Sequence, residues 1–380
     1  MNNSQLAMWA PEPPAYAAVT SSPEVDALLR ANSPVAFGVS GGDDSALMVL
    51  EGIDYLNSIG HTGPRILIHA DLGRTDWADS LPACKRLAER TGLRLEVVKW
   101  KGGDLLDRWQ KRWDDNVQRY AELSCVRIIK PWSSAKWRFC TKELKTAVIC
   151  AHLVRMFPGH TIINAVGLRW EESDNRGKMP IWKDEEELRK VKLQTKGVAW
   201  HPVMAWKLAG RDARLAELGY ERHEAYTKFD MPRVACSFCF FAVKTWAMSA
   251  EDERNLPAFY FQVELEIAST FSFSETAWLA DSRPDLLSPF QQKRLAESKR
   301  KGELREAAEA RIPKHLNYTD GWPTVMPTYE EAVLLAEVRS EVAELLGLQI
   351  GFTTPERILE RYAALMKIGA SRLAKKRRAA

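Results

Sequence analysis

The stretch from Val35 to Leu47 limits most strongly what this chain can fold into. An apolar, β-branched run at residues 35–39 leads into Ser40-Gly41-Gly42-Asp43-Asp44-Ser45, and a helical pattern starts at Ala46. This order predicts a strand, a glycine turn and a helix N-terminus. Two glycines allow positive φ and a close approach of a ligand, and the free N–H groups of the helix favour a phosphate. Ser40 and Ser45 add hydroxyl donors, so we expect a nucleotide-binding loop at residues 40–45.

Two common phosphate-binding patterns are absent from this loop. It lacks the lysine and the spacing of the G-x-x-x-x-G-K-[ST] loop. It also lacks the G-x-G-x-x-G fingerprint of dinucleotide-binding domains. The loop therefore indicates a different kind of nucleotide site.

Strand patterns alternate with helical patterns through the first part of the chain, which predicts βαβ units and a parallel sheet covered on both faces. Ligands of such sheets bind beyond the carboxyl ends of the strands. Residues 40–45 follow the first expected strand, Asp71 ends the second and Arg169 ends the fourth. The expected strands are 35–39, 65–70, 94–100 and 161–168, and the expected helices are 22–30, 44–58, 77–91, 104–122, 142–157 and 208–218.

The chain has 380 residues, which favours about two domains. The charged stretch 178–197 is expected to be a solvated insertion. After Cys239 the pattern changes to long helices at 246–281, 289–311, 328–346 and 354–378. We therefore expect an N-terminal extension over 1–30, an α/β domain over 31–245 and a helical C-terminal subdomain over 246–380.

Composition excludes some classes of protein. Hydrophobic residues make up 46% of the chain, and no run of 18 apolar residues predicts a membrane span. The first residues lack a basic segment followed by an apolar one, so we expect a cytoplasmic protein. Six cysteines in this length do not make a disulfide scaffold. In a reducing compartment, clustered cysteines more often bind metal or take part in chemistry.

Positive charge is concentrated late in the chain, although the net charge is only +4. Eight lysines and arginines lie between Pro289 and His315, and the chain ends near Lys375-Lys-Arg-Arg378. Such runs are usually solvated helix faces. A surface for a nucleic-acid backbone is the sharper alternative, and fourteen tryptophans are compatible with it.

Several segments together resemble one family. Ser40–Ser45 resembles the S-G-G-x-D-S loop of the PP-loop ATP pyrophosphatases, which cleave ATP between the α- and β-phosphates. The segment Gly167–Arg176 matches the Gly-x-Arg-x-x-Glu-Ser-x-x-Arg element of the PAPS reductase-like branch, which includes DNA phosphorothioation proteins. The resemblance spans about residues 30–245 and implies an adenine nucleotide alpha hydrolase-like fold, a doubly wound and mostly parallel sheet. Further elements in matching order are Ile68–Gly73, Trp137–Lys145, His201–Trp206 and Arg233–Cys239.

The resemblance implies roles for individual residues. Arg169 and Arg176 offer planar, permanently charged forks for phosphate oxygens. The alternative interpretation of these residues is a surface salt-bridge cluster. Asp44 is expected to hold a Mg²⁺ that bridges the phosphates. Glu172 orients an arginine or shares the metal. The implied catalytic residues are Asp44, Lys145, Arg169, Glu172 and Arg176, and the implied ATP-binding residues are Ser40, Gly41, Gly42, Asp43, Ser45, Asp71, Gly167 and Ser173. Asp71 is also compatible with a helix N-cap.

The cysteines point to sulfur or metal chemistry. Cys236 and Cys239 form a C-x-x-C pair, and Cys140 lies in the cysteine segment of the resembled family. Soft thiolates suit an iron–sulfur cluster, which we expect to be of the 4Fe–4S type, or Zn²⁺. A persulfide dithiol and plain buried thiols remain as alternatives. Cys125, Cys84 or Cys150 can supply a fourth ligand, but Cys84 and Cys150 lie in helical patterns and are expected in the core.

One departure from the family separates the functional hypotheses. Sulfonucleotide reductases use a cysteine near the C-terminus as nucleophile, and no cysteine follows Cys239 here. The first hypothesis is therefore ATP-dependent sulfur transfer to nucleic acid, either DNA or tRNA, with adenylylation of the acceptor and a sulfur donor such as a cysteine desulfurase. The alternatives are an unusual PAPS or APS reductase and a non-enzymatic nucleotide-binding module. The sequence leaves the oligomeric state open.

Overall fold

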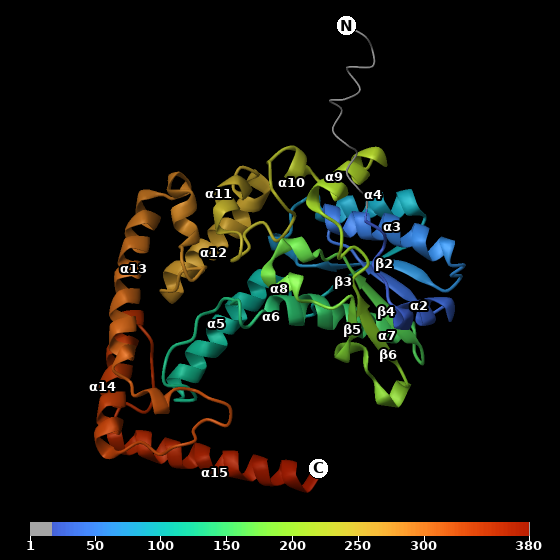
Figure 1. Cartoon of the computed structure of the whole chain (residues 1–380). Coiled ribbons are helices and arrows are strands. Elements are labelled where there is room, and N and C mark those ends of the chain that lie inside the picture. The colour runs from blue at the N-terminus through green and yellow to red at the C-terminus, as the bar shows by residue number, and fades with distance from the viewer. Residues whose placement is uncertain (1–16, 380) are drawn as a thin grey trace. The chain divides into compact units, whose positions relative to one another are not determined.

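The computed structural model describes residues 17–379, of which the side chains are described up to residue 369. The chain divides into two compact units (Figure 1). Unit 1 comprises residues up to Leu105, then Arg138–Cys239 and Glu251–Asn255. Unit 2 comprises Leu106–Trp137, Phe240–Ala250 and Leu256–Ala380. The expected domain limits at 30 and 245 stay a prediction, and most of the extension over 1–30 lies outside the described residues.

Unit 1 contains a six-stranded sheet in the order β3-β2-β1-β4-β6-β5. All neighbours pair in parallel except β5, which runs antiparallel to β6. The order reverses between β1 and β4, as in doubly wound sheets, which confirms the expected fold class. The strands are β1 (Val35–Gly38), β2 (Arg65–Asp71), β3 (Arg94–Lys99), β4 (Thr161–Val166), β5 (Trp182–Asp184) and β6 (Lys196–Trp200).

Helices cover both faces of this sheet because alternate strand residues point to opposite sides. Val35 and Phe37 of β1 pack into one buried cluster, together with apolar residues of four helices. Ala36 packs into the cluster on the other face, which involves one main helix. The first face carries α2 (Pro23–Arg30), α3 (Asp43–Ser58), α4 (Ser80–Thr91) and α9 (Leu208–Glu217), and the second carries α7 (Ala147–Met156).

The expected solvated insertion at 178–197 is only partly correct. Its charged side chains are mostly exposed, but Trp182–Asp184 adds an edge strand and residues from Lys196 onward begin β6. Leu188 is fully buried against the second face of the sheet. The strand signal is weak because β5 is short and two of its three residues, Lys183 and Asp184, are charged.

Unit 2 is helical (Figure 1). The expected single helix over 246–281 is wrong, because Thr270 adopts a positive φ of 59° directly after α12. Capping boxes at Ser288 and Thr328 start two long helices where the sequence predicts them. The helices are α5 (Leu105–Ala121), α11 (Trp246–Ser249), α12 (Leu256–Ser269), α13 (Pro289–Ala310), α14 (Tyr329–Leu346) and α15 (Pro355–Ala379).

Tryptophans contribute mainly to the cores. Trp109, Trp132 and Trp246 gather around Phe273 in unit 2, with ring centroids 4.9 to 5.5 Å from that ring. Six of the tryptophans within residues 17–379 are fully buried. No helix in residues 17–379 is both long and apolar enough to cross a membrane.

Candidate functional site

The reversal point of the sheet brings the glycine loop and the Arg169 segment together. The loop follows β1, and Gly167 follows the neighbouring β4. A Cβ on Gly167 would lie 2.7 Å from the carbonyl oxygen of Asp44 and 3.0 Å from the N atom of Ser45. Gly167 therefore lets the end of β4 pack directly on the first turn of α3, which is a role in positioning the backbone.

The loop has the expected strand–turn–helix form. Gly41 has a φ of +81°, and Gly42 is the extended N-cap of α3. Ser45 Oγ donates to the Gly42 carbonyl at 2.7 Å and accepts from the Ser40 N–H at 3.4 Å. Ser45 thus closes the loop, while Ser40 remains exposed. The N-terminus of this 16-residue helix lies at the carboxyl edge of the sheet.

The two aspartates that follow the glycines hold three arginines, of which Arg169 and Arg211 are buried. Asp43 is fully buried, and its Oδ2 accepts from Arg222 Nε at 2.8 Å. Asp44 Oδ1 accepts from Arg169 Nε at 2.6 Å and from Arg211 Nη1 at 3.0 Å. Burial raises the pKa of Asp43, although Arg222 and Arg211 oppose the shift. Asp44, which is expected to hold Mg²⁺, fixes two arginines at the loop in this structure.

Within the Arg169–Arg176 segment, Arg169 is only 5% exposed, whereas most of the residues that follow it are exposed. Glu172 accepts from the Arg169 N–H at 2.9 Å and pairs with Arg176. Glu172 therefore orients arginines in this structure, which is one of its two predicted roles. Ser173 Oγ accepts from the Arg176 N–H at 3.3 Å and caps the short helix α8 (Asp174–Gly177).

The His201–Trp206 element is a turn at the end of β6, as predicted. The His201 N–H donates to the Ile181 carbonyl at 2.9 Å, and its ring Nδ1 lies 2.8 Å from the Pro180 carbonyl. Burial lowers the pKa of His201. The turn leads into α9, which delivers Arg211 to the two aspartates.

The end of β2 forms a tight turn beside the loop. Asp71 Oδ1 accepts from the Gly73 N–H at 2.7 Å, so Asp71 closes this turn and does not cap α4, which begins at Ser80. Asp76 accepts from the Leu72 N–H at 2.9 Å and lies 4.0 Å from His69 Nε2. Burial raises the pKa of Asp76.

Lys145 gathers the three predicted cysteines. It lies in a π-helical turn (Lys142–Thr146) between α6 (Phe139–Thr141) and α7, and such turns frequently occur at functional sites. Burial lowers the pKa of Lys145, but the charges of Cys236, Asp76, Cys140 and Cys239 outweigh it and the pKa is raised. Burial raises the pKa of Cys236 to about 12, against the pull of Lys145.

Cys140, Cys236 and Cys239 are the predicted ligands of a metal or cluster. Their soft sulfur donors have the chemistry that an iron–sulfur cluster or Zn²⁺ requires. However, within residues 17–379 no three His, Cys, Asp or Glu side chains are arranged to hold a metal ion. Cys84, Cys125 and Cys150 are buried, and Cys84 and Cys150 belong to the core clusters as predicted. The structure therefore shows Cys140, Cys236 and Cys239 near a lysine.

Hydrogen bonds hold the C-x-x-C segment against the nucleotide loop. The Ser237 N–H donates to the Thr75 carbonyl at 2.8 Å, which ties the segment to the turn after β2. The Val234 N–H donates to Tyr226 Oη at 3.2 Å. Tyr226 Oη also accepts from the Asp43 N–H at 3.3 Å, at the first turn of α3. The predicted ATP loop and the predicted thiols thus belong to one site.

Sequence reasoning missed four residues of this site, namely Arg211, Arg222, Tyr226 and Asp76. Three of them come from the segment 207–226, which carries no motif. The helical pattern after the His-Pro element, with Arg211 on it, was the one available signal. Asp76 lies five residues after the predicted Asp71 in the same turn.

The basic run of unit 2 is largely neutralised. Lys299 pairs with Asp281 at 2.6 Å, and Arg311 pairs with Glu341 at 2.7 Å. Arg305 is buried and pairs with Glu309. Arg294 and Lys301 also have carboxylate partners. The structure therefore favours the solvated-face interpretation for 289–315, and the side chains of 375–378 lie outside the described residues.

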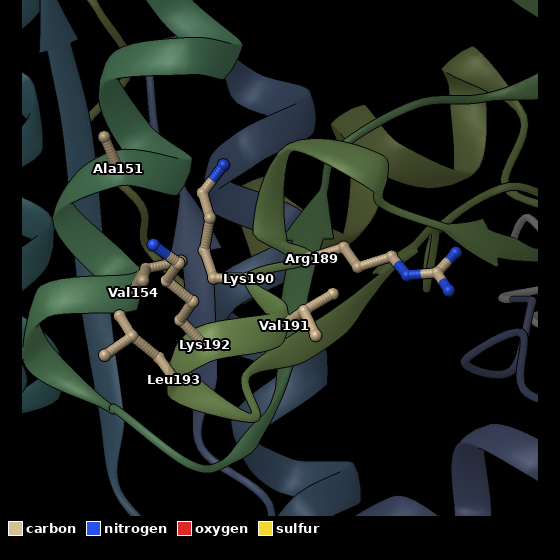
Figure 2. Close-up of a pocket in the computed structure, with 7 residues that line it drawn as sticks. All are labelled: Ala151, Val154, Arg189, Lys190, Val191, Lys192 and Leu193. Atoms are coloured by element: carbon tan, nitrogen blue, oxygen red, sulfur yellow. The ribbon is translucent and has the colours of Figure 1, made fainter. Parts of the chain in front are cut away.

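An open pocket lies elsewhere on unit 1. It has a volume of about 550 Å³, and Figure 2 shows its lining by Ala151 and Val154 of α7 and by residues 189–193. Residues 189–193 precede β6 and so lie at the amino end of that strand, whereas the glycine loop follows the carboxyl end of β1. This pocket is therefore separate from the candidate site.

No family model and no curated protein matches the sequence. Among solved structures, the chain is similar to an FMN adenylyltransferase from Candida glabrata in complex with FAD and pyrophosphate, with 11% identity, a TM-score of 0.35 and coverage of 53% of this chain and 54% of that one. The chain is also similar to a PAPS reductase from Candida auris, with 14% identity, a TM-score of 0.34 and coverage of 58% of this chain and 98% of that one. A third similar structure is the U34-tRNA thiolase NcsA from Methanococcus maripaludis with its [4Fe-4S] cluster, with 15% identity, a TM-score of 0.34 and coverage of 74% of this chain and 79% of that one.

Proposed function

We propose that this chain is a PP-loop ATP pyrophosphatase of the PAPS reductase-like family that uses ATP to transfer sulfur to a nucleic-acid acceptor. One observation carries the proposal. The glycine loop, the buried arginines and the C-x-x-C segment meet at one edge of the sheet and are joined by hydrogen bonds through Tyr226 and Thr75. A nucleotide site and a thiol site in direct contact are what ATP-driven sulfur transfer requires.

The first step is assigned to the loop and the arginines. The ATP phosphates bind the N-terminus of α3, and Mg²⁺ accompanies them. An oxygen of the acceptor attacks the α-phosphorus, the bond to the β-phosphate breaks and pyrophosphate leaves. Arg169 and Arg211 are 5% and 2% exposed, and a buried guanidinium stabilises developing phosphate charge more strongly than an exposed one.

The second step is assigned to the thiols. Sulfur bonds to the activated centre of the acceptor, and AMP departs with the oxygen. Lys145 places a positive charge near Cys140, Cys236 and Cys239, and this charge opposes the rise that burial causes in the pKa of Cys236. We retain a 4Fe–4S cluster, with zinc as the alternative, as the group that these thiols hold, and a bound cluster would supply an iron position for sulfide.

Nucleic acid as the acceptor follows from the resemblance to DNA phosphorothioation proteins. The run 289–315 adds little support, because most of its cations are paired. A sulfur donor protein such as a cysteine desulfurase is the partner that this chemistry needs.

The test is release of pyrophosphate from Mg-ATP by the full chain under anaerobic conditions, with DNA, with tRNA and with neither. We expect release that depends on one nucleic acid and that Arg169→Met abolishes. Arg90→Met is the matched control, because Arg90 is exposed and bonds only carbonyl groups, of Leu218 and Gly219, in its described contacts. Absence of both ATP binding and nucleic-acid binding would contradict the proposal.

A further inference from the structure

We propose that the Tyr226 hydroxyl couples the nucleotide loop to the thiol segment, so that nucleotide binding sets the position of Cys236 and its neighbours. Tyr226 is then a positioning residue that regulates the site. This inference rests on the proposed function only in taking ATP as the ligand of the loop.

A single oxygen atom joins the two half-sites. Tyr226 lies on the short helix α10 (Glu224–Thr227), and its Oη accepts from the Asp43 N–H at 3.3 Å and from the Val234 N–H at 3.2 Å. Asp43 is the first residue of α3, and Val234 stands two residues before Cys236. The bonds span 183 and 8 positions of sequence, so no local turn explains the first of them.

The phenol ring is held by a group that also binds the loop. The Arg222 guanidinium lies 4.6 Å from the centroid of the Tyr226 ring and donates to the Asp43 carboxylate. A Cβ on Gly42 would lie 3.3 Å from Val234 Cβ, so the loop backbone already touches the thiol segment. Packed interiors contain few voids and transmit strain. A displacement of the loop therefore moves the groups that it contacts.

An arriving phosphate acts on this assembly through charge. Asp43 and Asp44 hold Arg222, Arg211 and Arg169 in ion pairs. A phosphate at the N-terminus of α3 repels the two carboxylates and attracts the arginines. Since Arg222 contacts both Asp43 and Tyr226, its shift changes the hydroxyl that receives the Val234 N–H.

The thiol segment can turn this shift into a change at sulfur because its other side is fixed. Ser237 donates to the Thr75 carbonyl from its N–H at 2.8 Å and from its Oγ at 3.2 Å. Cys236 lies between this anchor and Val234. Movement at Val234 alone therefore reorients Cys236 relative to Lys145. By linkage, the state of the thiols changes nucleotide affinity by the same factor.

The experiment is hydrogen–deuterium exchange of the full chain with and without α,β-methylene-ATP, which cannot be cleaved between the α- and β-phosphates. Binding is measured in parallel by calorimetry. In the wild-type chain we expect the analogue to slow exchange in residues 231–239 as well as in the loop. In Tyr226→Phe we expect the analogue to bind, exchange in 231–239 to be about tenfold faster, as loss of one hydrogen bond implies, and the response of 231–239 to the analogue to disappear.

Tyr55→Phe is the matched control, because it removes a hydroxyl that bonds Asp26 on another part of unit 1. It should retain the wild-type response. If Tyr226→Phe does not fold, Arg222→Met tests the same coupling and should also abolish the response of 231–239. An unchanged response in a folded variant that binds the analogue would overturn the inference alone. Failure of the wild-type chain to bind the analogue would overturn it together with the proposed function.

Discussion

Replacing Gly41 by alanine tests the loop geometry on which the nucleotide site depends. Gly41 has a φ of +81°, and an added Cβ would lie 2.9 Å from the Ser80 carbonyl oxygen and 3.0 Å from His223 Cδ2. The left-handed conformation costs an alanine about 1 to 2 kcal/mol. Overpacking against backbone that cannot yield costs about 1 to 3 kcal/mol more. We therefore expect a total loss of about 2 to 5 kcal/mol.

Gly92→Ala separates these two contributions. Gly92 has a φ of +67° at the C-terminus of α4, and nothing lies within 4 Å of an added Cβ. Its alanine variant carries the conformational cost but not the steric one. Unfolding in urea should show Gly41→Ala to be less stable than Gly92→Ala by about 1 to 3 kcal/mol, and calorimetry should show at least tenfold weaker ATP binding for Gly41→Ala only. Equal stability and equal affinity of the two variants would refute the reasoning.

Further predictions concern buried charge and pH. Arg211→Met leaves two carboxylates without their buried partner and should cost about 3 to 5 kcal/mol in urea unfolding; a loss below 1 kcal/mol would contradict this. Glu266→Ala leaves three buried N–H groups unpaired in unit 2 and should cost about 3 kcal/mol or more, measured by tryptophan fluorescence in urea. Burial lowers the pKa of His61, His201 and His223. Below pH 6.5, the ordinary pKa of a histidine, the unfolded chain therefore binds more protons than the folded chain. The stability that the neutral histidines allow is fully present above pH 6.5 and is lost as the pH falls below that value. The midpoint of urea unfolding should decrease as the pH is lowered from 7.5 to 5.5, and the decrease should be smaller in His223→Asn. An equal decrease in the variant would show that His223 does not contribute.

Much of the fold was predictable because its strands are apolar runs between clear turn signals. The four expected strands agree with β1 to β4 within two residues at each end. β5 was missed because a three-residue antiparallel edge strand with two charged residues leaves little hydrophobic pattern. The break after α12 was missed because Thr270 adopts its positive φ through tertiary contacts, which residue type alone does not indicate.

The site was predictable where residues follow strand ends directly. The glycine loop, Asp71 and Arg169 all lie at the carboxyl edge of the sheet, as parallel topology requires. Arg211 and Tyr226 were not predictable, because they reach the loop from 167 and 183 positions away in sequence. For the run at 289–315 the structure favours the solvated-face interpretation, but its carboxylate partners were not predictable, because they come mostly from other helices and turns.

The measurement that tests the central claim most directly is the identity of the ATP bond that breaks. Phosphorus NMR of Mg-ATP incubated anaerobically with the full chain, nucleic acid and a sulfide donor distinguishes the products. The loop at residues 40–45 with Arg169 and Arg211 predicts AMP and pyrophosphate. Formation of ADP and inorganic phosphate would contradict the account.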